Sequence, residues 1–469
     1  MAVKSMLTDN NTAPFILFGP PGTGKSTCLV EAIAQLWIQS KSRNHKILVC
    51  APSNSAIDTL TSSLLKFIPP SEILRIYPAN REKSLIPERI TKNRCYNLNA
   101  QGEIRYPTLA KLRRPTVIAT TLVGTSKLVT SGLGLTAHFT HIVIDECGQA
   151  TEPETLIPIT GLSRISNAKI NEPTPIKIIL SGDPFQLGPI ILSSHAAKMG
   201  LGVSLLERLM ALPAYKPDPK TKKYNPNAVV KLLQNFRSHP MILEPSNQMF
   251  YNNELLASGN SEVINMACGW SKLPNKSVPI IFHSVKGKEK YEPHSLSCSN
   301  PSEITVVLDY LENILLPGKI NEKTITQEDI GVISPYRCQI NLLKQVFEKK
   351  GWKNVMTGTI DEFQGLEKLI TIISTVRSKT TDSNKGQIGF LKDPKRLNVA
   401  LTRARALSII IGNDKVLSTD AHWCRVINQC RLSDAWRETK EEMGEAMSRN
   451  RRQRKKKREN GASGRNAAE

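Results

Sequence analysis

An eight-residue segment near the start of the chain has the composition of a phosphate-binding loop. Its sequence, GPPGTGKS, runs from Gly19 to Ser26 and fits the pattern G-x-x-x-x-G-K-[ST]. Glycines in such a loop let backbone N–H groups turn around phosphate oxygens, and the N-terminus of the following helix adds its positive dipole. The Lys25 ammonium would reach the β- and γ-phosphates, and the Ser26 hydroxyl would ligate Mg²⁺. The loop therefore predicts a nucleoside triphosphate site.

Two acidic residues close an apolar stretch farther along the chain. The stretch HIVIDE ends in Asp145 and Glu146. Asp145 would hold the water shell of Mg²⁺, while Glu146 would orient and deprotonate an attacking water. Alone, such an ending is as readily a solvated strand end, but with the phosphate loop it predicts phosphoanhydride hydrolysis. His138 and His141 lack further ligands nearby, so we interpret them as ordinary surface or core histidines.

A parallel sheet would bring the loop and the two acids together, and the first half of the chain has that pattern. Short apolar runs alternate with loops and helical segments, and each run ends in small, polar or acidic residues. Ligands gather at the carboxyl ends of strands in open α/β sheets. The predicted strands are 15–18, 46–52, 116–121, 141–146 and 176–183.

A second alternating series predicts a second sheet. It follows a connection at 211–228 that is rich in proline and lysine and has no periodicity. Its predicted strands are 278–285, 330–336, 355–361, 369–378 and 407–413, with a helix over 342–350.

The fold class predicted from these patterns is α/β, with two tandem parallel-sheet domains. The first covers 1–210 and carries an inserted segment at about 66–114, which is either a nucleic-acid contact region or a solvated excursion. The connection at 211–228 is the predicted linker, and the second domain covers 229–430. Residues 431–469 are expected to be helical at first and then basic and disordered.

The charge balance favours a polyanionic partner. Sixty-three Lys and Arg residues face 41 Asp and Glu residues among 469, which gives a net charge of +22. The stretch RNRRQRKKKR near the C-terminus holds eight of the basic residues, and it is read as a solvated tail, a non-specific RNA contact or a nuclear-import signal. The body keeps an excess without that stretch, so nucleic acid is the predicted partner.

Cysteine usage and hydropathy place the chain among proteins of a reducing compartment. Nine cysteines are scattered without a C-x-x-C pair, which predicts free thiols rather than disulfides or structural zinc. No run approaches the roughly 18 apolar residues that a membrane helix needs, and the start has no secretory signal pattern.

The motifs as a set resemble those of superfamily 1 helicases. GPPGTGKS, APSNSAIDTL, ATTLVGTSKL, DECGQATEPE, SGDPFQLGPI, NFRSHP, ISPYRCQ, GTIDEFQGLE and RLNVALTRARA occur in the order and approximate spacing of that family. The stretches GLGVSLLERL, VPIIFHSVKGK and GFLKDPKRLNVALTRARA are most similar to the RNA helicases of the Moloney leukaemia virus ten and Armitage branch, which is related to the nonsense-mediated-decay helicase. The resemblance implies two RecA-like domains with ATP and Mg²⁺ bound in the cleft between them.

The same resemblance implies roles for further residues. Gln186 would report the γ-phosphate, and Phe236 would stack on the adenine. Arg237 would meet the γ-phosphate from the second domain, and Arg403 would be the arginine finger, with Arg405 as the less favoured choice. The nucleotide contacts implied in all are Gly19, Pro20, Pro21, Gly22, Thr23, Gly24, Lys25, Ser26, Thr27, Phe236, Gly365 and Glu367.

Nucleic-acid contacts are implied on both domains. Small polar groups and backbone amides suit phosphates and sugars, and Tyr336 would stack a base, so binding would be largely independent of sequence. The residues implied are Pro52, Ser53, Asn54 and Thr121 on the first domain and Pro335, Tyr336, Arg337 and Thr359 on the second.

These expectations combine into a monomeric motor that hydrolyses ATP when single-stranded RNA is bound and moves 5′ to 3′. The family resemblance suggests a role in RNA silencing or RNA turnover beside Argonaute-type proteins, in the cytoplasm or in RNA granules. The alternatives are a DNA helicase of the same branch and a nucleotide-dependent RNA clamp without efficient turnover.

The start of the chain departs from the family pattern. AVKSML (2–7) resembles the residues that follow the adenine-recognising glutamine motif, so that glutamine would fall just before Met1. The expectation is a catalytic core truncated at its start, as a fragment, a short isoform or a divergent gene. Cys147 also replaces the commoner alanine or serine after the second acid, and a small buried thiol should be tolerated there.

Overall fold

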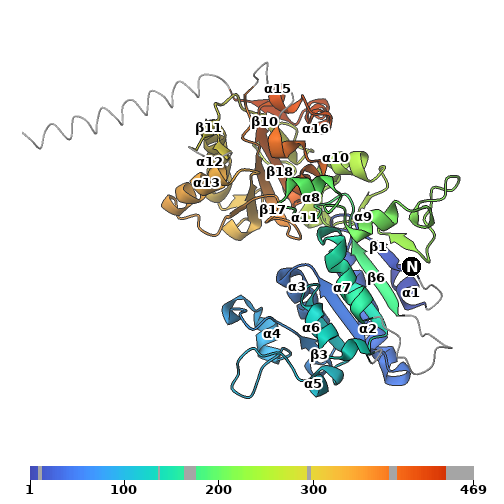
Figure 1. Cartoon of the computed structure of the whole chain (residues 1–469). Helices are drawn as coiled ribbons and strands as arrows, with labels where there is room; N and C mark the ends of the chain where they lie inside the picture. Colours follow the sequence, from blue (N-terminus) through green and yellow to red (C-terminus); the bar gives the residue numbers. More distant parts are fainter. Residues whose placement is uncertain (9–12, 136–137, 163–175, 293–296, 380–387, 440–469) are drawn as a thin grey trace, which may run out of the picture. The chain divides into compact units, whose positions relative to one another are not determined.

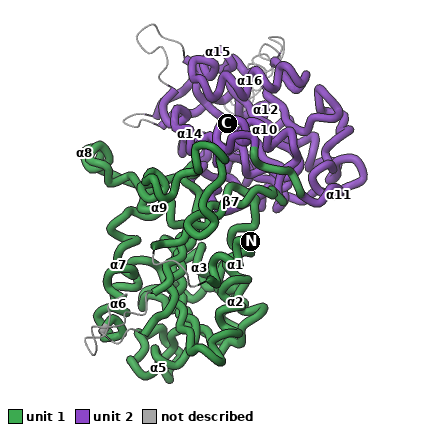
Figure 2. Tube along the Cα trace, turned by 90° about the vertical axis from the view of Figure 1, so that its right-hand side faces the viewer, with its two compact units in different colours: residues 1–236, 254–258 green, residues 237–253, 259–469 purple. Residues whose placement is uncertain are grey.

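The computed structural model describes residues 1–8, 13–135, 138–162, 176–292, 297–379 and 388–439. The chain divides into two compact units, shown in different colours in Figure 2. Unit 1 comprises Met1–Phe236 with Glu254–Ser258, and unit 2 comprises Arg237–Asn253 with Gly259–Glu469. One boundary between the units thus falls on the peptide bond between Phe236 and Arg237.

The described part of unit 1 is built on a seven-stranded sheet in the order β3-β4-β2-β5-β6-β1-β7, with every neighbouring pair parallel (Figure 1). The central strands are short runs of apolar residues buried on both faces, as parallel strands between two helical layers require. The strands are β1 (Phe15–Phe18), β2 (Ile47–Ala51), β3 (Ile73–Arg75), β4 (Val117–Thr121), β5 (His141–Ile144), β6 (Lys177–Gly182) and β7 (Val229–Lys231).

The strand order places the helices of unit 1 on opposite faces of its sheet. From β1 to β2 and on to β4 the chain moves one way across the sheet, and from β4 to β5 and β6 it moves back. Right-handed crossovers therefore put the first pair of helices on one face and the second pair on the other, and the reversal opens a crevice at the carboxyl ends of the strands. The first pair is α2 (Lys25–Arg43) and α3 (Asn54–Leu64), whose core also takes in α1 (Ala2–Leu7), and the second is α6 (Thr125–Thr130) and α7 (Glu152–Leu162).

Unit 2 has a six-stranded parallel sheet in its described part, in the order β16-β15-β17-β18-β10-β19. Two amphipathic helices, α12 (Pro301–Leu315) and α13 (Arg337–Lys349), share a core with alternate residues of these strands, while α10 (Pro240–Phe250) packs against β18 and α16 (Ala421–Leu432) against β10. The strands are β10 (Ile280–Ser284), β15 (Ile330–Ile333), β16 (Met356–Gly358), β17 (Lys368–Ser374), β18 (Ala404–Gly412) and β19 (Trp436–Glu438).

Shorter elements complete the two units. The helices are α4 (Glu88–Asn93), α5 (Leu109–Arg113), α8 (Ser194–Lys198), α9 (Leu205–Met210), α11 (Ser261–Ile264), α14 (Pro394–Leu401) and α15 (Asp414–Leu417). The strand pairs are β8 (Gln234–Asn235) with β9 (Leu256–Ala257), β11 (Lys290–Tyr291) with β12 (Cys298–Ser299) and β13 (Lys319–Ile320) with β14 (Lys323–Thr324).

The predicted α/β class with two parallel-sheet domains is confirmed, and each of the ten predicted strand segments overlaps an observed strand. The nine cysteines are free thiols. In the residues that the structure describes, no helix is long and apolar enough to cross a membrane.

Three short edge strands correct the predicted boundaries. Strand β7, placed at the start of the second domain, pairs with β1 of unit 1. Strand β3 lies inside the predicted insertion at 66–114, yet it pairs with β4 as part of the main sheet. Strand β19 lies inside the predicted tail, yet it pairs with β10 of unit 2. The predicted basic, disordered end lies outside the described residues from residue 440 onward.

Candidate functional site

The phosphate loop connects β1 to α2, as its mechanism requires. Gly24 caps the helix with φ of 77°, a left-handed conformation that favours glycine. At Gly19 any Cβ would lie 2.8 Å from the Lys25 Cβ, so this close approach also needs glycine. The Gly19 N–H donates to the Gly182 carbonyl at the end of β6, 2.9 Å away, which fixes the loop to the neighbouring strand.

Lys25 lies beside both acids at the end of β5. Its Nζ is 2.6 Å from Glu146 Oε1 and 3.6 Å from Asp145 Oδ1. Burial alone would lower the pKa of Lys25, but the two carboxylates outweigh it and raise the pKa above its ordinary value. The ammonium therefore stays charged at the position where a polyphosphate needs a cation.

Ser26 and Asp145 fit a Mg²⁺ site of the type that nucleotide-binding loops form. The Ser26 hydroxyl lies 3.5 Å from Asp145 Oδ2, and both are the hard oxygen ligands that Mg²⁺ prefers. Burial raises the pKa of Asp145, Lys25 opposes that shift, and Glu146 adds to it. Within the described ranges, no group of three or more His, Cys, Asp or Glu side chains could hold a metal by itself. Such a site would depend on phosphate oxygens and water to complete the coordination of the ion.

Glu146 is held in a strained backbone conformation. Its φ of 51° is in the left-handed region, which costs a residue with a Cβ of the order of 1–3 kcal/mol. Gln149 Nε2 donates to Glu146 Oε2 over 2.6 Å, while the other carboxylate oxygen faces Lys25. The strain and these two contacts together fix the direction of the carboxylate.

Gln186 follows β6, next to β1 in the sheet. Its Nε2 donates to Asp183 Oδ2 over 2.9 Å, and Asp183 also accepts from the Phe185 N–H. Asp183 is buried, so these hydrogen bonds hold the turn that carries Gln186 in place. The structure therefore brings Gln186 to the same sheet edge as the phosphate loop.

Asn235 and Phe236 lie against the phosphate loop from the far end of unit 1. The Phe236 N–H donates to the Gly22 carbonyl over 2.8 Å, and Asn235 Nδ2 donates to the Pro21 carbonyl over 2.7 Å. The Phe236 side chain is 51% exposed, so its ring is available for stacking. The sequence reasoning missed Asn235; its only signal was a polar residue directly before the Phe-Arg pair.

Within unit 2, a second cluster forms around Glu367. Arg237 Nε donates to Glu367 Oε2 over 2.7 Å, and Arg237 Nη1 donates to the Thr402 carbonyl. Arg405 Nε lies 3.8 Å from the other oxygen of Glu367. Gly365, two residues before Glu367, has φ of 78°. The structure thus pairs Arg237 with Glu367, two residues after Gly365, and the resemblance had placed all three at the nucleotide.

Arg403, the implied arginine finger, is deeply buried. Its guanidinium donates to the carbonyls of Val399 and Leu366 and to the Thr402 hydroxyl, over 2.9 to 3.1 Å. It is only 1% exposed, whereas the Arg405 side chain is 34% exposed. Arg403 would have to exchange some of these hydrogen bonds to bind a phosphoryl group.

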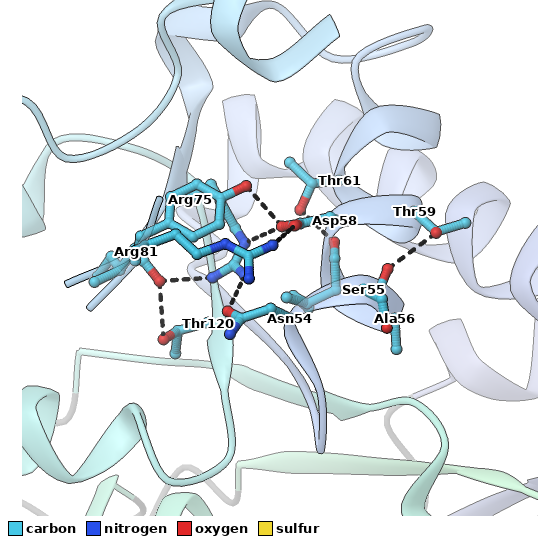
Figure 3. A network of polar contacts seen from close by, with 12 residues as sticks. Asn54, Ser55, Ala56, Asp58, Thr59, Thr61, Arg75, Arg81 and Thr120 are labelled. Atoms are coloured by element: carbon cyan, nitrogen blue, oxygen red, sulfur yellow. Dashed lines mark hydrogen bonds and ion pairs between the residues drawn. The ribbon is translucent and has the colours of Figure 1, made fainter. Parts of the chain in front are cut away.

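The implied nucleic-acid residues of unit 1 meet at the carboxyl ends of β2 and β4, which are neighbours in the sheet. Pro52 and Ser53 follow β2, and the Ser53 hydroxyl accepts from the Ala56 N–H as the N-cap of α3. Asn54 Oδ1 accepts from Arg75 over 2.8 Å (Figure 3). Thr121 ends β4, and its hydroxyl accepts from the Gly124 N–H. The four residues therefore share one sheet edge.

The implied nucleic-acid residues of unit 2 follow β15 and β16, which are also neighbouring strands in their sheet. Thr359 exchanges two hydrogen bonds with Glu362 across a turn, and the Arg337 side chain, after Pro335 and Tyr336, is 78% exposed. Tyr336 is 3% exposed and its ring lies against Phe390, so the base-stacking role expected for it would require the side chain to move. Phe390 itself is 53% exposed.

Two protein-family models match this chain, and between them they extend over most of its length. One family model described as "AAA domain" matches residues 201–415, and a second with the same description matches residues 1–97 and 79–194. A solved structure titled "The structure of PRRSV helicase" overlaps with a TM-score of 0.39 and 13% identity, covering 88% of this chain and 54% of that one. So remote a likeness adds nothing to the assignment.

Curated relatives extend over most of the chain. "Putative helicase MOV-10" of Gallus gallus is 43% identical over 93% of this chain and 46% of that protein. "RNA helicase Mov10l1" of Homo sapiens is 39% identical over 90% of this chain and 33% of that protein. "Probable RNA helicase armi" of Drosophila melanogaster is 34% identical over 90% of this chain and 37% of that protein. The chain thus spans less than half the length of these relatives. With the motif geometry described above, they show that the chain belongs to the superfamily 1 helicases of the MOV10 and Armitage branch.

Proposed function

We propose that this chain is the ATP-hydrolysing motor core of an RNA helicase. The observation that carries the proposal is the contact of Lys25 with Glu146 and Asp145 directly beneath a phosphate loop of the expected conformation. Ser26 next to Asp145 supplies the oxygen pair that suits Mg²⁺. A pure binding module has no chemical need for all of these groups in one place.

The residues of unit 1 would divide the chemistry among them. The loop N–H groups and Lys25 bind the phosphates, and Ser26 and Asp145 would hold Mg²⁺, which neutralises phosphate charge when bound. Glu146 accepts a proton from the attacking water as the new bond to the γ-phosphorus forms and the bond to the ADP oxygen breaks. Gln186 donates a hydrogen bond to the γ-phosphate, so that residues at the same sheet edge can respond to whether the γ-phosphate is bound.

We infer that unit 2 completes the nucleotide site. Arg237 and Glu367 form one ion-paired cluster, and the resemblance assigns Arg403 beside them as the finger that stabilises charge on the transferring phosphoryl group. Nucleotide turnover would then open and close a cleft between the two domains, and contacts on each domain would alternately hold and release a nucleic-acid strand.

Single-stranded RNA is the proposed substrate. The support is the word "RNA" in the names of the human and fly relatives, together with the net charge of +22. Movement 5′ to 3′ and a cytoplasmic role in RNA silencing or turnover beside Argonaute-type proteins extend the proposal by family resemblance. Comparing ATPase stimulation by RNA and DNA of one sequence tests it against the DNA helicase alternative.

The first experiment measures ATP hydrolysis with and without single-stranded RNA for the whole chain, Lys25→Ala, Glu146→Gln and the surface control Glu31→Gln. We expect RNA-stimulated turnover in the whole chain and the control, and a loss of at least about 10²-fold in the other two, the usual scale for a lost acid-base group. Glu146→Gln should still bind RNA, because it leaves the nucleic-acid edge intact. Background turnover with intact RNA binding would instead support the nucleotide-dependent clamp.

A further inference from the structure

A cavity of about 510 Å³ lies on unit 1 between helix α3 and the segment that follows β3. Its volume is within the range of about 300–1,000 Å³ usual for sites that bind small ligands. Serine and threonine residues of α3 line one wall, Thr59 and Ser62 among them. Lys66, Arg81 and Arg89 line the rest. None of these residues belongs to the nucleotide site or to the implied nucleic-acid contacts.

The charge of the cavity is positive, because its one acidic residue is already neutralised. Asp58 is buried and accepts from Arg75 Nε over 2.8 Å and from the Tyr77 hydroxyl over 2.7 Å (Figure 3). Arg75 is fully buried, so this ion pair is a permanent part of the fold. Arg81 approaches the other oxygen of Asp58 only to 3.7 Å. The cavity is therefore lined by three cationic side chains, and its one carboxylate, Asp58, is already paired with Arg75.

Two buried polar atoms of the cavity wall have unused hydrogen-bonding capacity. Within the described part of the chain, Arg81 Nε and Ser62 Oγ are buried without a hydrogen-bond partner. Arg81 is held in place by its Nη2, which donates to the Leu85 carbonyl over 3.0 Å. These two atoms are closed to solvent, whereas the Arg81 side chain as a whole is 19% exposed. The cavity therefore has the charge and the size to hold a phosphate group.

The position of the cavity indicates where that phosphate comes from. Helix α3 begins at Asn54, directly after the implied strand contact Ser53, and the cavity wall begins at Ser55. Leu85, which is 56% exposed, and Pro87 supply an apolar surface beside the cations that suits a ribose or a base. A strand bound at Ser53 would thus continue along α3 into the cavity.

We propose that this cavity binds one nucleotide of the bound single-stranded RNA, with its phosphate on Lys66, Arg81 and Arg89. The proposal rests on the proposed function and names a subsite for it. Binding there lengthens the contact with the strand on unit 1 beyond the carboxyl ends of β2 and β4, and it is independent of base sequence because the charged contacts go to the phosphate.

The test is the salt dependence of RNA binding by the whole chain. Fluorescence anisotropy with a labelled twelve-nucleotide uridine RNA, without ATP, gives the Kd between about 50 and 250 mM KCl. For the double variant Lys66→Ala, Arg89→Ala we expect the slope of log Kd against log salt to fall by about 0.7 to 1.4, which is one to two phosphate contacts on a single strand. The Kd near 150 mM should rise about tenfold.

The matched control removes two positive charges from unit 1 at a site away from the cavity. Lys41 and Arg43 are exposed in the last turn of α2, whose first turn carries the phosphate loop. Lys41→Ala, Arg43→Ala should leave the slope unchanged and the Kd within about twofold. Thr59→Glu, which puts a negative charge on the cavity wall, should weaken binding more than Thr59→Gln. Thr59 is exposed on a helix that tolerates either residue.

Several outcomes would overturn the cavity assignment. Equal slopes for the whole chain and the Lys66→Ala, Arg89→Ala variant would do so, as would equal effects of Thr59→Glu and Thr59→Gln. Binding of uridine monophosphate, inorganic phosphate or a phosphopeptide that the double variant loses, with RNA binding unaffected, would assign the cavity to another ligand. If the whole chain itself failed to bind RNA, the proposed function would fail instead, so the two failures are distinguishable.

Discussion

At the scale of single residues, chemistry that depends on local sequence was predictable and chemistry that depends on distant partners was not. The phosphate loop fixes Lys25 and Ser26 through its own glycines, so a motif of eight residues was enough to find them. The carbonyls that surround Arg403 come from Leu366 and Val399, and no spacing rule points to them. The burial of Tyr336 against Phe390 depends on packing in the same way.

The choice between Arg403 and Arg405 follows from those surroundings. We expect Arg403→Ala to lower kcat about 10³-fold, the lower end for an arginine finger, and also to lower the Tm, because three buried acceptors lose their donor. Arg405→Ala should change kcat by less than about tenfold and leave the Tm unchanged, since its ion pair with Glu367 is long and both side chains are partly exposed. Steady-state ATPase assays and thermal unfolding check both. A larger kcat loss for Arg405→Ala would reassign the finger to it.

At the scale of elements, long apolar strands were found from the sequence and short edge strands were missed. Strands β3, β7 and β19 have three residues each, too few for a period-two pattern to be recognised. Each is stabilised by one neighbouring strand and by contacts remote in sequence. In β3 the last residue is Arg75, a fully buried charge whose partner Asp58 lies on α3. A charged residue in a proline-rich segment indicated a loop, and only the tertiary ion pair makes it part of a strand.

A buried acid connects the start of α12 to the end of β17 and gives unit 2 a pH dependence. Glu303 accepts from the Ser374 hydroxyl over 2.6 Å and from the Val376 N–H over 2.9 Å. Burial raises the pKa of Glu303 to about 8, although those donors favour the ionised form. Between about pH 4.5 and 8 the unfolded chain has released this proton and the folded chain has not. The free energy of unfolding should therefore fall as the pH rises, by at most about 1.4 kcal/mol per unit.

Glu303→Gln should remove that dependence, so its Tm relative to the whole chain should rise from pH 5 to pH 8. Thermal unfolding at several pH values measures it, with the exposed Glu322→Gln as the control that should run parallel to the unsubstituted chain. Parallel curves for Glu303→Gln as well would show that the carboxyl is already ionised in the folded state.

At the scale of the whole molecule, positive charge is spread over the chain and is not confined to its end. Residues 440–469 contain ten basic residues but also five acidic ones, so most of the net +22 belongs to residues 1–439. We expect a chain that stops at residue 439 to retain RNA-stimulated ATPase activity. Its salt slope for RNA binding should be shallower, as fewer phosphates are neutralised. Loss of stimulation on removing these residues would show that the tail supplies the main RNA contact.

The boundary between Phe236 and Arg237 has a consequence for the proposed nucleotide site. Phe236, the proposed adenine contact, belongs to one unit and Arg237, the proposed γ-phosphate contact, to the other, yet their Cα atoms are only about 3.8 Å apart along the chain. The backbone link between the two residues therefore has a fixed length, although it can rotate about its torsion angles. Inserting a single glycine between them would keep both side chains but lengthen the link by up to about 3.8 Å. The insertion should therefore uncouple the recognition of the base from the recognition of the terminal phosphate.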